Sequence, residues 1–178
     1  MSMKFEVSDL IAHPVSKVYP VFRDHIADLA QYLPNVKRIE IIERKEEGGL
    51  VHVTSDWYAQ ASLPNSARKF FPENKLGWRD VAAWNTKQQS VDWHFVLWLF
   101  TEAVHVSGHN AFTAEGKQTR LTINGEWVID PAKIRGIPNI ILRGVIPTVE
   151  KFAFALVKPN LLKVNRAVEK LLSEGKIK

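Results

Sequence analysis

The chain has 178 residues, 46% hydrophobic and 24% charged, which fits one domain with a core of its own. Its net charge of +5 comes without a block of like charges, so we expect no nucleic-acid partner, and the absence of cysteine excludes disulfides and a thiolate nucleophile. No signal peptide is visible and the longest apolar run, Phe95 to Phe100, is too short for a bilayer. We therefore expect a single cytoplasmic domain over residues 1–178.

The first third of the chain mixes strand and helix patterns. Lys4 to Ala12 alternates apolar and polar residues and predicts a strand. A short helix beginning at Pro14 follows, and Asp24 is placed to cap a second short helix that ends near Tyr32. The remaining elements of this part are two strands, Val36–Lys45 and Leu50–Ala61, and the glycine turn at 46–49 between them.

The stretch from Lys75 to Ile129 predicts four consecutive strands. The turns between them are expected at Asn85–Gln89, at Thr101-Glu102 and at Glu115-Gly116. The pairs that face each other in this register include Asp80 with Phe95, Phe95 with Gly108, and Val106 with Gly125. All three turns put the same apolar phase on one face of the sheet, and a one-residue slip would reverse that face.

The end of the chain predicts a long amphipathic helix. Its apolar stripe runs from Ile146 to Leu172, and Pro159 should bend or break it. The whole pattern indicates an α+β fold, in which a curved antiparallel sheet of seven strands wraps around this C-terminal helix. Two short helices follow the first strand. A sheet that curves around one helix leaves room for a pocket between them.

The inward face of the predicted sheet is rich in large rings and carries two polar side chains. The candidate ligand-binding residues are Trp78, Asp80, Trp84, Trp93, Phe95, Asn110 and Trp127 from the sheet, with Phe152 and Leu156 from the helix. Apolar walls with a few polar groups are typical of small-molecule sites. The alternative is a packed aromatic core with Asp80 and Asn110 near its rim. A buried Asp80 must be neutral or paired, and the alternative is that it meets Arg79, Arg120 or solvent at a strand end.

Motifs of catalysis and of cofactor binding are missing from the sequence. Neither a glycine-rich phosphate loop nor a G-x-S-x-G nucleophile turn is present. His105 and His109 lie about 13 Å apart if they share a strand, while His94 is expected opposite His109, and two histidines alone are weak evidence for zinc. We expect no metal and no cofactor, and the sequence leaves open whether the protein is an enzyme.

Two surface segments suggest partners. Trp98 and Phe100 share the outer face of the predicted sheet, where they form either a homodimer contact or a covered patch. Residues 134–145 are apolar and are flanked by Lys133, Arg135 and Arg143. This segment either touches a membrane surface or packs over the open end of the core.

The order of these patterns resembles the START-like (SRPBCC) superfamily of helix-grip proteins, which includes polyketide cyclases, lipid carriers and coenzyme Q-binding carriers. The matching segments are HPVSKVYPVFRDHIADLAQYLPNVKRIEIIERKEEGGLVHV, TRLTINGEWVIDP and the C-terminal helix. The resemblance implies a cavity for a hydrophobic small molecule or lipid, used by a carrier or sensor. It also allows a cyclase or aromatase, in which Asp80 would act as general acid or base, and a lipid-transfer protein that docks on membranes through residues 134–145. The superfamily has no universal catalytic set, so no catalytic residue is transferred.

Overall fold

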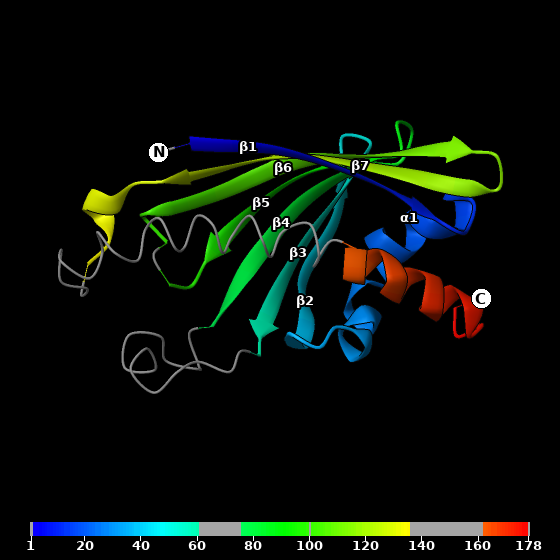
Figure 1. The fold of residues 1–178 in the computed structure, drawn as a ribbon, viewed down its shortest axis with the longest axis horizontal. Helices are drawn as coiled ribbons and strands as arrows, with labels where there is room; N and C mark the ends of the chain where they lie inside the picture. The colour runs from blue at the N-terminus through cyan, green and yellow to red at the C-terminus, as the bar shows by residue number, and fades with distance from the viewer. Residues whose placement is uncertain (1, 61–75, 100, 136–161, 178) are drawn as a thin grey trace.

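The computed structural model describes residues 2–60, 76–99, 101–135 and 162–177. Within these ranges, seven strands form one antiparallel sheet in the order β1-β7-β6-β5-β4-β3-β2. The strands are β1 (Ser2–Ile11), β2 (Val36–Glu47), β3 (Leu50–Ala59), β4 (Gly77–Asn85), β5 (Ser90–Leu97), β6 (Val104–Glu115) and β7 (Gln118–Ile129). The sheet curves over α1 (Val15–Asp24) and over the C-terminal helix, which lie on its concave face (Figure 1). This is the expected α+β helix-grip architecture.

The helices differ in detail from the prediction. Helix α1 begins directly after Pro14 and continues through Pro20, because Tyr19, Val21 and Phe22 are buried around the proline. The second short helix is the 3-10 helix η1 (Ile26–Tyr32). The expected cap at Asp24 is wrong, because His25 precedes η1 and makes no side-chain cap. Another short 3-10 helix, η3 (Pro131–Lys133), follows β7.

The predicted register is correct for one hairpin and shifted for two others. Asp80 faces Phe95 as expected. Phe95, however, faces Val106 instead of Gly108, because the connection from β5 to β6 is centred one residue before the predicted turn at Thr101-Glu102. Val106 in turn faces Trp127 instead of Gly125, because the β6–β7 turn sits at Gly116-Lys117. Each error is a shift of two residues, so every side chain keeps its predicted face.

The described part of the C-terminal helix covers 162–173 and is fastened to β1. Ala167, Val168 and Leu171 are buried in the main core. The polar contacts of this junction are Arg166 Nη2 to Asp9 Oδ2 (2.6 Å), Asn165 Nδ2 to Asp9 Oδ2 (2.9 Å), Arg166 Nη2 to the Leu10 carbonyl (2.9 Å) and the Ala12 N–H to Glu169 (2.7 Å). The remainder of the expected helix, with Pro159, lies outside the described residues.

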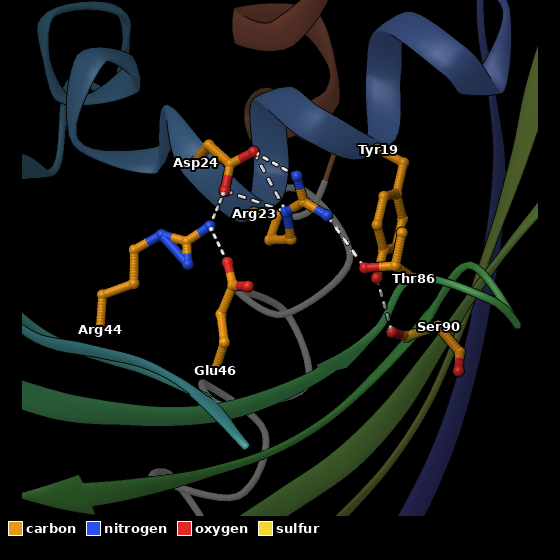
Figure 2. A network of polar contacts seen from close by, with 7 residues as sticks. All are labelled: Tyr19, Arg23, Asp24, Arg44, Glu46, Thr86 and Ser90. Atoms are coloured by element: carbon orange, nitrogen blue, oxygen red, sulfur yellow. Dashed lines mark hydrogen bonds and ion pairs between the residues drawn. The ribbon is translucent and has the colours of Figure 1, made fainter. Parts of the chain in front are cut away.

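A network of polar contacts ties the end of α1 to the strand ends beside it. Figure 2 shows its members, which are Tyr19, Arg23, Asp24, Arg44, Glu46, Thr86 and Ser90. Arg23 donates to Asp24 at 2.6 Å and to the Thr86 hydroxyl at 2.9 Å, and Arg44 donates to Asp24 at 3.1 Å. The Tyr19 hydroxyl donates to the Ser90 carbonyl at 3.3 Å. Asp24 therefore joins α1 to β2.

Candidate functional site

Four rings on the concave face form a continuous row across three neighbouring strands. Trp57 of β3 stacks on Trp78 of β4 with ring centroids 5.3 Å apart, since the two residues face each other in the sheet. Trp78 lies 5.9 Å from Phe95 of β5, and Phe95 stacks on Trp93 at 4.6 Å. We call Trp57, Trp78, Phe95 and Trp93 the aromatic row. Trp57 is 7% exposed and belongs to the main core, whereas the other three rings are half-buried and offer flat apolar surface of the kind that binds planar ligands.

Asp80 places a carboxyl group beside the aromatic row. It faces Phe95 on one neighbouring strand and Ser55 on the other. Its Oδ1 atom is buried and has no hydrogen-bond partner in the described part of the chain. Burial raises the pKa of Asp80 to about 7, because the charged form is poorly solvated there.

The basic residues that were expected as partners of Asp80 are engaged elsewhere. Arg79 forms a two-pronged ion pair with Asp56 at 2.7 and 2.9 Å. Arg120 pairs with Glu115 at 2.6 Å. Asp80 is buried away from solvent, and a neutral carboxyl is therefore favoured over an ion pair with either arginine.

The indole N–H groups of the row differ in their partners. Trp57 Nε1 donates to the Ser55 hydroxyl at 3.1 Å, and Trp93 Nε1 donates to Asn110 Oδ1 at 2.7 Å. Trp78 Nε1 is buried and has no partner among the described residues. Two residues apart on the same face of β4, Trp78 and Asp80 thus each keep a buried polar atom unsatisfied, which is costly unless a ligand or water pairs with it.

Glycines in the neighbouring strands make room for the rings. A Cβ atom at Gly108 would lie 2.4 Å from Cζ2 of Trp93, which faces it across β5 and β6. A Cβ atom at Gly125 would lie 2.3 Å from the Phe5 ring. Both rings therefore lie close against the backbone of the neighbouring strand.

Two other predicted sheet residues take different positions. Trp84 is 7% exposed and lies edge-on to Tyr19 of α1 at 5.5 Å, so it belongs to the packed core under α1. Trp127 packs against a second small core of Val104, Val106 and Ile129, with Trp93 and Phe95 on its border. Phe152 and Leu156, expected from the helix, lie outside the described residues.

Trp57 and Ser55 were not among the predicted site residues. Both lie on β3, which is separated from β4 by the connection over residues 60–76. A tight turn fixes which residues face each other, but a connection of this length leaves the register open. The signal in the sequence that could have found them is the alternation of Val51, Val53, Ser55 and Trp57, which places these residues on one face of the strand. In the structure all four are buried.

The opposite face of the sheet carries a hollow of about 700 Å³. Its lining includes the polar side chains of His52, Asp92, His94 and His109. His109 faces and pairs with Asp92 at 2.7 Å, so the expectation that it faces His94 is wrong. No three potential metal-binding side chains come together within the described ranges.

The structure describes only part of the two segments that were expected to contact partners. Trp98 lies edge-on to Tyr58 at 4.8 Å, while Phe100 is outside the described residues, as are 136–145. Ile134 packs on the second small core. Membrane and homodimer contacts stay predictions. No helix in the described ranges is long and apolar enough to cross a bilayer.

Solved structures similar to this chain share its fold. No family model matches the sequence, and no curated protein matches it. TTHA0849 from Thermus thermophilus is 17% identical with a TM-score of 0.67, and the similarity covers 98% of this chain and 100% of the other. The Zhui aromatase/cyclase from Streptomyces sp. R1128 is 17% identical with a TM-score of 0.62, and the similarity covers 97% of this chain and 96% of the other. Norcoclaurine synthase from Thalictrum flavum, in complex with dopamine and hydroxybenzaldehyde, is 15% identical with a TM-score of 0.64. This similarity covers 100% of this chain and 90% of the other. At these identities the likenesses show a shared fold.

Proposed function

We propose that the protein binds a hydrophobic small molecule with an aromatic ring, and that the ligand lies on the concave face against the aromatic row. One observation carries the proposal: Trp78 Nε1 and Asp80 Oδ1 are buried, unpaired among the described residues and adjacent among stacked rings. A core that served only stability would not be expected to keep two such groups unsatisfied, since each costs about 1–3 kcal/mol.

The chemistry of the surface supports a flat, largely apolar ligand. Stacking on a ring contributes about 0.5–1.5 kcal/mol beyond burial, and burial itself about 25 cal/mol per Å² of apolar surface. The ligands named for norcoclaurine synthase are both aromatic, and the Zhui protein is an aromatase/cyclase. Their similarity to this chain is one of fold, and their aromatic chemistry is in keeping with the proposal.

The test measures binding and stability in the same variants. Trp93→Ala removes one end of the aromatic row, so we expect the Kd of 2-ethylnaphthalene to rise about tenfold, with a smaller change in unfolding free energy. Isothermal titration calorimetry and urea denaturation supply the two readouts.

Trp84→Ala is the matched control, because it removes the same side chain from the packed core. It should cost about 3–5 kcal/mol of stability. Unchanged affinity in Trp93→Ala, or a loss of stability as large as that of Trp84→Ala, would count against the proposal. Native mass spectrometry of the protein purified from cells would show which molecule it carries.

A second candidate function is catalysis on such a ligand. The observation in its favour is Asp80, because a pKa of about 7 allows the carboxyl both to give and to take a proton near neutral pH. In a cyclase-type reaction it would act as general acid or base on a ligand carbonyl. Asp80→Asn should then abolish turnover of the identified ligand and leave its binding nearly intact. Turnover that survives in this variant would rule out the role.

A further inference from the structure

The hydrogen bond between Trp93 and Asn110 fixes how the Asn110 amide is turned. Trp93 Nε1 lies 2.7 Å from Asn110 Oδ1. An indole N–H can only donate, so the amide must present its oxygen to the indole and its NH₂ group away from it. The identity of the two amide atoms, which is often ambiguous, is settled here by the chemistry of the partner.

The Trp93 ring is itself held in place from two sides. It lies against Gly108, where a Cβ atom would approach within 2.4 Å of Cζ2, and it stacks on Phe95 at 4.6 Å. Gly108 and Asn110 lie two residues apart on the same face of β6. The ring therefore reaches across β6 from Gly108 to the Asn110 side chain, and it cannot turn away without losing both contacts.

The free side of the Asn110 amide consists of two N–H donors in an apolar setting. Asn110 faces Val91 on one neighbouring strand and Ile123 on the other, and both are almost completely buried. The described part of the chain supplies no acceptor for the Asn110 NH₂ group. Trp78 Nε1, on the far side of Phe95 within the aromatic row, is a second donor without a partner among the described residues. The polar groups that this face offers to a ligand are thus two donors, Trp78 Nε1 and the Asn110 NH₂ group, and the carboxyl group of Asp80.

We propose that Asn110, oriented by Trp93, selects among aromatic ligands for those that carry a carbonyl or similar acceptor oxygen. This inference rests on the proposed binding function and adds the chemical class of the ligand. Asn110 touches the ligand oxygen, and Trp93 acts on it as a positioning residue. An aromatic ligand of the same shape without the oxygen leaves the NH₂ group buried and unpaired, and it binds more weakly.

The experiment compares two probes that differ by one oxygen. In wild-type protein, 2-acetylnaphthalene should bind roughly five- to tenfold more tightly than 2-ethylnaphthalene, the effect of one hydrogen bond. Asn110→Asp keeps an oxygen for Trp93 but replaces the donor with an acceptor, and it should lose this preference. Asn110→Ala should lose it as well, and it guards against misfolding caused by a new buried charge. In Asn110→Ala the affinity for 2-ethylnaphthalene should rise, because no NH₂ group is then buried without a partner.

Trp93→Phe tests the positioning role, because it keeps a ring on Gly108 and removes the indole N–H. We expect the preference for 2-acetylnaphthalene to shrink in this variant while its melting temperature changes little. A preference that persists in Asn110→Ala, or that is absent in the wild type, overturns the inference although aromatic binding stands. If neither probe binds the wild-type protein, the proposed function fails, and the inference fails with it.

Discussion

Asp80 carries a carboxyl group on a face made of rings, and its surroundings explain its protonation. Ser55 and Phe95 are its cross-strand neighbours, and the nearby Arg79 is committed to Asp56. With burial as the cause, the pKa of Asp80 rises from its ordinary 3.8 to about 7. The folded protein therefore holds this proton over a pH range in which the unfolded chain has released it.

The sign of the effect on stability follows from this difference. Between pH 3.8 and about 7 the folded state binds more protons at Asp80 than the unfolded state, so stability should fall as pH rises through that window. The loss is about 1.4 kcal/mol per pH unit, or about 4 kcal/mol in all. In Asp80→Asn this decline should vanish, and the variant should be the more stable protein above pH 7.

Urea denaturation of wild type and Asp80→Asn from pH 4 to pH 8 measures the decline in unfolding free energy. The difference between the two proteins isolates the contribution of Asp80 from that of other titrating groups. Asp92→Asn, on the opposite face with a side chain 76% exposed, is the control and should keep the decline. Parallel stability curves for wild type and Asp80→Asn would show that Asp80 is solvated or paired in the folded protein.

At the scale of elements, the C-terminal helix depends on β1 for its position. Burial opposes the charge on Asp9, but hydrogen bonds from Asn165 and Arg166 outweigh it and hold the pKa of Asp9 below its ordinary value. Asn165 is 2% exposed and so has no water to replace this contact. The junction fastens the helix at 162–173 and so sets where the chain returns to the concave face.

Asn165→Ala should loosen this junction. Removing the amide weakens the contact with Asp9 and costs about 1–3 kcal/mol. Amide hydrogen exchange should then speed up in 162–173 and in β1, while β3 and β4 keep their protection. Arg38→Ala, at the exposed far edge of the sheet, is the control and should change neither region. Faster exchange spread evenly over the whole protein would contradict a local fastening.

Across the whole molecule, the concave face is divided between packing and a surface suited to binding. Under α1, the rings of Tyr19, Trp84 and Phe112 meet edge to face or tilted at 5.3 to 6.2 Å, and Phe112 is 2% exposed. Beyond α1, Trp78, Trp93 and Phe95 are only half-buried. The polar network of Figure 2 ties α1 to the sheet at its packed part, and the proposed ligand contact falls on the less buried part.

The sequence by itself determined the fold class and the face on which each sheet residue lies. The alternation of strand residues has a period of two, so the two-residue shifts at β5–β6 and β6–β7 left Phe95, Asn110 and Trp127 on their predicted face. The pairing of Asp80 with Phe95 was also predictable, because one short turn between their strands sets which residues face each other.

Only the tertiary structure decided which of these residues are packed away and which keep unpaired groups. Trp84 and Trp93 have the same alternation, but α1 covers only Trp84. The bond from Trp93 to Asn110 depends on a register that a two-residue shift changes, and the stack of Trp57 on Trp78 joins strands far apart along the chain. Local periodicity specifies the direction of a side chain, whereas its partners depend on how distant segments meet.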